Sequence, residues 1–174
     1  MKKIAIYPGS FEYFTIFNLN ILEKAEKIFG KENVIISIGV NKNNLSIDTQ
    51  KIIIGYDKSD VDDIMDRTGQ TRCNRIKNFL PSKNLEYYSG FLTDYVFEKE
   101  KEGYDVTIIR GLKSSYNMDV EYNKTRFMWD LKPDLKIVYI PCDPIYAHVS
   151  SRAYKELEDS KPGAGHQYLA RENN

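Results

Sequence analysis

Three short segments of the chain combine residue types that suit a bound phosphate. In the first, Gly9 and Ser10 follow an apolar run. Glycine allows a ligand to approach the backbone closely, and serine offers a hydroxyl to an anion. A plain strand-to-helix turn would use the same two residues, so this segment leaves both interpretations open.

The second segment carries two cations. Arg110 and Lys113 follow the apolar residues 106–109, with Gly111 between them. Arginine binds a phosphate through paired hydrogen bonds, whereas lysine supplies a point charge. A solvated loop with surface charges is the alternative, but a position at the mouth of a buried strand favours an anion site.

The third segment is the start of a predicted helix. Ser150 and Ser151 are suited to cap it, and an uncrowded helix N-terminus binds phosphate through its backbone N–H groups. Arg152 and Lys155 lie three residues apart, on neighbouring positions of one helix face. An ordinary N-cap is the alternative interpretation.

The elements that position these segments alternate along the chain. Apolar runs predict strands over residues 3–7, 33–40, 85–88, 105–109 and 135–140, and a short extra strand over 51–56. Helical spacing predicts helices over 17–29, 60–80 (with a break at Gly69), 92–101, 118–131 and 149–158. This order predicts an α/β fold with a Rossmann-like, doubly wound parallel sheet. A ligand would then lie beyond the carboxyl ends of the strands, among residues 8–18, 41–46, 110–113 and 141–151.

Composition narrows the class of protein. We expect one domain over residues 1–160 and a loose tail over 161–174. The 25 basic and 25 acidic side chains cancel, which argues against general nucleic-acid binding. No apolar run is long enough to span a bilayer, and the immediate entry into a strand leaves no room for a signal peptide. Two cysteines and two histidines predict no disulfide framework and no side-chain metal site, so we expect a cytoplasmic protein.

The order and spacing of several motifs resemble the nucleotidylyltransferase superfamily, and most closely the phosphopantetheine adenylyltransferases. The similarity runs from about residue 2 to residue 158. The matching segments are Tyr7-Pro8-Gly9-Ser10-Phe11, Gly39-Val40-Asn41, Gly90-Phe91-Leu92-Thr93-Asp94-Tyr95, Ile109-Arg110-Gly111-Leu112-Lys113, Glu121-Tyr122 and Val149-Ser150-Ser151 with Lys155.

The resemblance implies a reaction and a set of site residues. That family transfers AMP from ATP to 4′-phosphopantetheine in coenzyme A biosynthesis, releases pyrophosphate, uses Mg²⁺ that arrives with the nucleotide, and forms hexamers. The implied partners are therefore a nucleotide, a phosphorylated acceptor and further copies of the chain. The implied catalytic residues are Ser10, Asn18, Lys42 and Arg110. The implied nucleotide-binding residues are Gly9, Ser10, Phe11, Phe17, Arg110, Gly111, Lys113, Glu121, Ser150, Ser151, Arg152 and Lys155.

The chain departs from the family pattern at its hallmark. Where the family has Thr-x-Gly-His, this chain reads Thr15-Ile16-Phe17-Asn18. Asparagine donates a hydrogen bond but cannot carry the positive charge of an imidazole. A benzyl group at position 17 would occupy space used by the nucleotide unless it turns into the core. Lys42 would supply the acceptor-side cation from a shifted position.

Two functions are therefore open. The chain is either an active nucleotidylyltransferase, slowed or redirected to another substrate, or a non-catalytic relative that binds a nucleotide or coenzyme or serves as an assembly subunit. A dinucleotide-dependent oxidoreductase fits less well, because the first turn lacks Gly-x-Gly-x-x-Gly and no acid ends the second strand.

Overall fold

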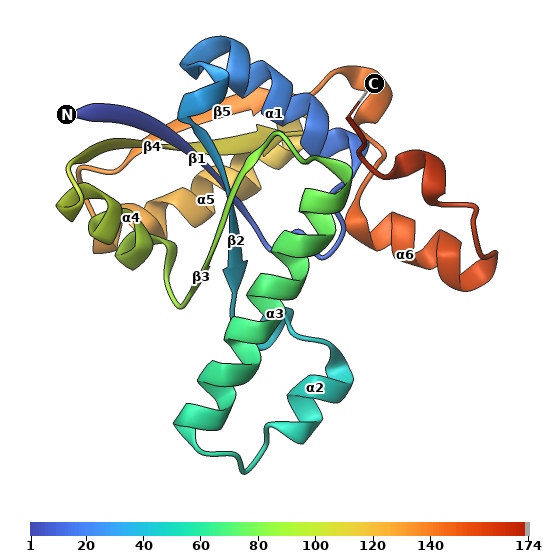
Figure 1. Cartoon of the computed structure of the whole chain (residues 1–174). Helices are drawn as coiled ribbons and strands as arrows, with labels where there is room; N and C mark the ends of the chain where they lie inside the picture. The colour runs from blue at the N-terminus through green and yellow to red at the C-terminus, as the bar shows by residue number, and fades with distance from the viewer. Residues whose placement is uncertain (173–174) are drawn as a thin grey trace.

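A computed structural model of the chain describes residues 1–172, without the side chain of Tyr116. In this part of the chain, five parallel strands form one sheet in the order β3-β2-β1-β4-β5 (Figure 1). The strands are β1 (Lys2–Gly9), β2 (Val34–Val40), β3 (Asn84–Ser89), β4 (Tyr104–Leu112) and β5 (Lys136–Pro141). The predicted Rossmann-like α/β fold, of nucleotidylyltransferase type, is confirmed.

Helices cover both faces of the sheet. The helices are α1 (Ile16–Phe29), α2 (Ile47–Ile52), α3 (Lys58–Phe79), α4 (Leu92–Lys101), α5 (Ser115–Leu131) and α6 (Ser151–Ser160), and short 3₁₀ turns lie at Lys31–Asn33, Lys42–Asn44, Pro144–Tyr146 and His166–Tyr168. Side chains alternate along each strand, so β1 directs Ala5 and Tyr7 toward α1 and α3, and Ile4 and Ile6 toward α4 and α5. Strands covered on both faces read as continuous apolar runs, which is why the sequence revealed them.

The strand order places a crevice beside β1. The chain builds β2 and β3 on one side of β1 and then crosses to β4 and β5 on the other side. At such a reversal, the connections leaving the two central strands diverge to opposite faces and leave a gap beyond their carboxyl ends. In this protein that gap lies between β1 and β4.

Two predictions about the segment between β2 and β3 are wrong. Residues 51–56 form no strand, because helix α2 ends at Ile52 and a turn follows. The Ser46 hydroxyl caps α2 by accepting from the Thr49 backbone N–H at 3.1 Å. Helix α3 also continues through Gly69 without a break, because the glycine serves packing: a Cβ there would lie 2.5 Å from Cδ2 of Tyr87 on β3.

The tail is ordered as far as the described residues extend. Leu169 bridges to Thr15, and the backbone N–H of Ala170 donates to the Phe14 carbonyl at 3.0 Å. Ala170 is only 2% exposed. The expectation of a loose tail is therefore wrong up to residue 172, and residues 173–174 lie outside the described part.

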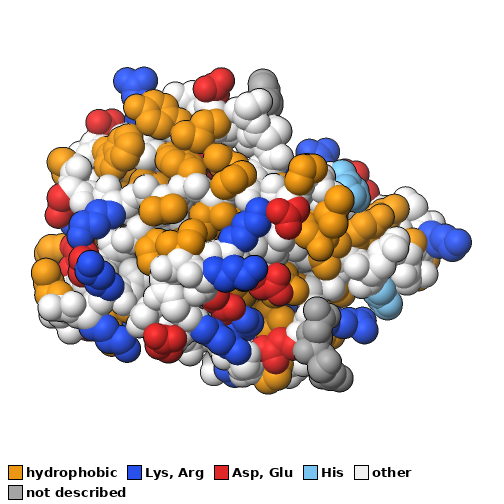
Figure 2. All heavy atoms as spheres, turned by 90° about the horizontal axis from the view of Figure 1, so that it is seen from above, with side chains coloured by type: hydrophobic (Ala, Val, Ile, Leu, Met, Phe, Trp, Pro, Cys, Tyr) orange, Lys and Arg blue, Asp and Glu red, His pale blue; other side chains and the backbone are white. Residues whose placement is uncertain are grey.

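The surface carries charges of both signs. On the face seen in Figure 2, Lys and Arg side chains alternate with Asp and Glu side chains, and no large basic field forms on this face. No helix within residues 1–172 combines the length and the apolar character needed to cross a membrane.

Candidate active site

A cavity of about 270 Å³ lies at the crevice between β1 and β4. This volume is close to the lower end of the usual range for small-molecule sites, roughly 300–1,000 Å³. The cavity is lined by Tyr7, Pro8, Gly9, Ser10, Phe11, Phe17, Asn18, Ile109, Arg110, Gly111, Glu121 and Ser151. Segments that are far apart in the sequence thus meet around one hollow.

The turn after β1 presents Ser10 to this cavity. Phe11 has a φ of 41°, in the left-handed region that a bulky residue rarely adopts. Its ring folds back over Gly9, where a Cβ would lie 2.6 Å from Cζ of Phe11. Gly9 therefore makes room for the Phe11 ring. Ser10 remains exposed, and its hydroxyl makes no hydrogen bond to another described residue.

Asn18 is held in one orientation at the first turn of α1. Its Oδ1 accepts from both the backbone N–H and the hydroxyl of Thr15 at 2.9 Å, and its Nδ2 donates to the Tyr7 hydroxyl at 3.2 Å. Burial raises the pKa of Tyr7, and the Asn18 hydrogen bond opposes that shift only in part. Asn18 is therefore a neutral, pre-oriented donor whose second amide hydrogen is available to a ligand.

The Phe17 ring has turned into the core while still forming one wall of the cavity. The side chain is 9% exposed and packs on Gly111, where a Cβ would lie 3.2 Å from the ring. The Lys113 ammonium lies 4.8 Å from the ring centroid, a cation–π geometry. The Phe17 ring therefore narrows the cavity without filling it, and the face of the ring contacts the Lys113 ammonium.

Arg110 and Glu121 form a half-buried ion pair on the α5 side. Nε of Arg110 donates to Oε2 of Glu121 at 2.8 Å, Nη2 of Arg110 lies 2.5 Å from the same oxygen as an ion pair, and Nζ of Lys124 donates to Oε1 at 2.9 Å. Burial acts to raise the pKa of Glu121, but the attraction of Arg110 and Lys124 outweighs it and holds the pKa below its usual value. Nη1 of Arg110 makes no hydrogen bond to any described side chain or backbone group, so it stays available to an anion.

The N-terminus of α6 borders the cavity through Ser151. The Ser150 hydroxyl caps the helix by accepting from Ala153 N–H at 3.0 Å, and the Ser151 hydroxyl donates to the Tyr13 carbonyl at 2.8 Å. Lys113 donates to the Val149 carbonyl immediately before the cap. Burial lowers the pKa of Lys113. A helix N-terminus and an arginine therefore border one cavity, with Lys113 behind the Phe17 wall, an arrangement suited to a polyphosphate.

Comparison with known proteins agrees with this geometry. No protein-family model matches the chain. The phosphopantetheine adenylyltransferase of Leptospira biflexa is 28% identical over 165 residues, covering 90% of this chain and 84% of that protein. Those of Clostridium novyi and Clostridium tetani are 27% and 26% identical, covering 89% and 88% of this chain and 83% and 82% of the relatives.

The chain is a distant homologue of the phosphopantetheine adenylyltransferases. The matched region covers 90% of this chain. Common ancestry and a common nucleotidylyltransferase fold follow from this homology, whereas the roles of single residues have to be argued from this chain's own geometry.

Five of the residues expected from the resemblance to the adenylyltransferases do not line the cavity: Lys42, Lys113, Ser150, Arg152 and Lys155. Arg152 is largely exposed and pairs with Glu156 at 3.0 Å, and Lys155 is exposed on the same helix. Lys42 is exposed on the 3₁₀ turn after β2. The two histidines also do not line the cavity; the ring of His148 contacts Tyr168 instead.

Two residues that the sequence did not single out belong to the region of the adenylyltransferase-like site. Tyr7 orients Asn18, and its position at the end of a buried strand was the available signal. Arg72 on α3 reaches the Ser10 turn. In the sequence, Arg72 is one of several cations on a predicted helix, so nothing there indicated its contact with the Ser10 turn.

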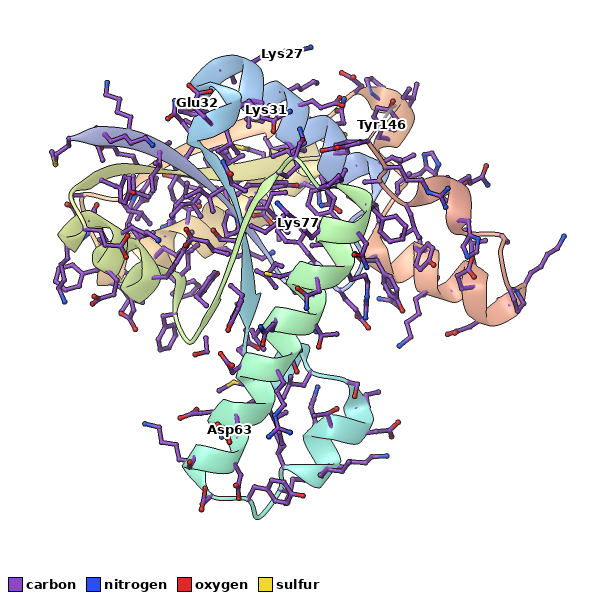
Figure 3. The ribbon with its side chains drawn as sticks, in the orientation of Figure 1. Lys27, Lys31, Glu32, Asp63, Lys77 and Tyr146 are labelled. Carbon is purple, nitrogen blue, oxygen red and sulfur yellow. The ribbon has the colours of Figure 1, made fainter. Side chains whose placement is uncertain are left out.

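A larger hollow of about 460 Å³ lies on the other side of α1. It is bordered by Leu19, Asn20, Tyr146 and His166, among others, and Figure 3 shows Tyr146 on the short helical turn beside α1. None of the motif residues shared with the adenylyltransferases lines it. The smaller cavity at the strand ends is therefore the candidate site.

Proposed function

We propose that this chain is a nucleotidylyltransferase that binds MgATP in the cavity between β1 and β4. It would transfer AMP to a phosphorylated acceptor, 4′-phosphopantetheine by analogy with the names of its relatives. The observation that carries the proposal is that Ser10, Asn18, Arg110 and Ser151 line one cavity at the topological switch point.

In the proposed reaction, a phosphate oxygen of the acceptor attacks the α-phosphorus of ATP. The bond from the α-phosphorus to the bridging oxygen breaks in line, and pyrophosphate leaves with the electron pair. Such a displacement requires positioning and charge neutralisation more than covalent catalysis. The Asn18 amide and Ser10 hydroxyl would donate to the α-phosphate, Arg110 and Lys113 would bind the triphosphate, and the start of α6 would receive its distal end.

A direct assay tests this proposal. We expect calorimetry to detect ATP binding, and pyrophosphate release to require 4′-phosphopantetheine. Replacing Arg110 by Gln should lower kcat/KM on the order of 10²–10³, the usual effect of one transition-state donor. Arg126→Gln, an exposed change on the same side of the sheet, is the matched control and should leave the rate unchanged.

The second candidate is a nucleotide- or coenzyme-binding protein without turnover. Two observations favour it: Glu121 already balances the charge of Arg110, and no histidine lines the cavity. In this case ATP binds but no pyrophosphate appears with any phosphorylated acceptor. Absence of both binding and turnover would eliminate both candidates.

The biological setting follows from the acceptor. With 4′-phosphopantetheine as acceptor, the chain would act in coenzyme A biosynthesis. We also propose a homo-oligomer, a hexamer by family resemblance, because α5 exposes large apolar side chains, Phe127 and Leu131, at 73% and 65%. The molar mass from light scattering would test this assembly independently of activity.

A further inference from the structure

Arg72 on α3 is a buried arginine that hydrogen-bonds to two loops, the Ser10 turn after β1 and the loop of residues 41–44 after β2. Its Nη1 donates to the Ser10 carbonyl at 3.0 Å and to Asn44 Oδ1 at 3.4 Å, and its Nη2 donates to the Asn44 carbonyl at 2.6 Å. The side chain is 6% exposed. Figure 1 shows α3 passing beside the end of β2, where the loop of residues 41–44 begins.

This arginine has no carboxylate to balance it. Within residues 1–172, no Asp or Glu side chain lies within ion-pair distance of Arg72, and all three of its acceptors are neutral oxygens. Burial lowers the pKa of Arg72, and the more distant Glu12 opposes that shift. A guanidinium nevertheless stays charged in proteins, so the fold accepts the cost of burying an unpaired cation. Such a cost calls for a role beyond filling space.

The loop after β2, residues 41–44, is joined by its own hydrogen bonds, and Arg72 binds it at Asn44. Asn41 Oδ1 accepts from the N–H groups of Asn43 and Asn44 at 3.0 and 3.1 Å. Asn44 Oδ1 accepts from Asn41 N–H at 3.2 Å, and Asn44 Nδ2 donates to the Gly39 carbonyl at 2.8 Å. Lys42 is part of this turn, so holding Asn44 in place also fixes the backbone of Lys42.

We propose that Arg72 is a positioning residue that fastens the Ser10 turn to the Asn41–Asn44 loop and thereby holds the Ser10 hydroxyl at the cavity between β1 and β4. The planar fork of the guanidinium suits this task, because it reaches acceptors on both loops at once. A lysine reaches fewer acceptors with its single ammonium. The kinetic effect expected of an Arg72 substitution rests on the proposed function, whereas the expected effect on the two loops does not.

The structural consequence is tested by hydrogen exchange on the whole chain. We expect Arg72→Met to raise amide exchange in residues 9–12 and 41–45 while protection in β1, β4 and α5 stays as in the wild type. Arg67→Met, an exposed change on the same helix, is the control and should leave every segment unchanged. Unchanged exchange in both loops of Arg72→Met would overturn the proposal, whatever the protein catalyses.

The kinetic consequence separates positioning from a general loss of structure. Arg72→Met should lower kcat/KM for the acceptor about 10²-fold, the typical effect of misplacing reacting groups by about 1 Å. ATP affinity by calorimetry should stay near the wild-type value, because Arg110, Lys113 and α6 are not held by Arg72. Arg72→Lys should recover part of the rate, since it keeps the charge and one hydrogen bond.

A purely structural role gives a different pattern. It would lower the unfolding temperature, raise exchange throughout the sheet, and reduce kcat with both KM values unchanged, which would overturn the proposal. If Arg72→Met does not fold, the same exchange comparison on Arg72→Lys decides the matter, with loop-specific exchange expected. A wild-type protein that neither binds ATP nor turns over would refute the proposed function alone and leave the exchange test intact.

Discussion

The amide nitrogen of Asn18 donates to the phenol of Tyr7 at 3.2 Å, while Thr15 holds the other end of the same amide through two hydrogen bonds. The donor at the mouth of the cavity is thus fixed before any ligand arrives. Pre-oriented donors need little reorganisation when charge develops on a phosphate. Asn18 thus offers a neutral donor in a fixed position, where a histidine would offer a positive charge.

A histidine at position 18 should reveal how much the missing charge costs. We expect Asn18→His to raise acceptor-dependent pyrophosphate release on the order of 10²–10³. The rate should also gain a pH-dependent limb near the ordinary histidine pKa of about 6.5, absent from the wild type, because no histidine lines the cavity. Asn78→His, an exposed change on α3, is the control. An unchanged rate with ATP still bound would contradict this role for position 18.

Phe17 and Lys113 should be energetically coupled. We expect Phe17→Leu to lower the free energy of unfolding by about 1–2 kcal/mol, through lost core volume and the lost cation–π contact. A double-mutant cycle with Lys113→Met in urea should give a coupling of about 0.5–1 kcal/mol. The same Phe→Leu change at Phe127, which is 73% exposed, should cost less than about 0.5 kcal/mol. Strict additivity of the Phe17 and Lys113 changes would argue against the contact.

The Arg110–Glu121 pair should make stability depend on pH. The pKa of Glu121 is lower in the folded chain than in the unfolded one. The ionised carboxylate therefore contributes fully to the free energy of unfolding above the unfolded pKa, about 4.3, and this contribution is lost as pH falls through the folded pKa. We expect Glu121→Gln to lower the free energy of unfolding by about 2 kcal/mol at pH 7, and this deficit to shrink below pH 4.

An exposed pair provides the comparison for Glu121. Glu98 bonds to Lys101 with both side chains more than half exposed, so Glu98→Gln should change stability by less than about 0.5 kcal/mol at any pH. Urea denaturation of both variants at pH 3 and pH 7 checks the two expectations. A deficit for Glu121→Gln that is equal at both pH values would rule out the charge as its cause.

The ordered tail should contribute to stability. Ala170 is buried against the start of α1, so Ala170→Asp places a carboxylate where water is excluded. We expect a loss of more than about 2 kcal/mol in the free energy of unfolding. Gln167→Asp, an exposed change in the same segment, should be within about 0.5 kcal/mol of the wild type in thermal or urea unfolding. Equal stability of the two variants would mean that the tail detaches in solution.

The sheet and the meeting of distant segments were determined by the sequence itself. Buried parallel strands have to be apolar on both faces, so β1, β2 and β4 appear as runs that need no tertiary knowledge to find. Parallel strands also share one carboxyl edge, which is why Gly9, Arg110 and Ser151 were predicted at one site and meet at one cavity.

Other features were decided only by the tertiary structure. The direction of the Phe17 ring depends on the space that Gly111 leaves, and the bridge made by Arg72 joins residues 62 and 28 positions away. The docked tail likewise depends on neighbours distant in the chain, because Ala170 bonds to Phe14 and Leu169 bridges to Thr15. Local periodicity reports which face of an element is apolar, but it carries no information on which partner covers that face. Side-chain direction and loop-to-loop contacts therefore became visible only when the whole chain had packed.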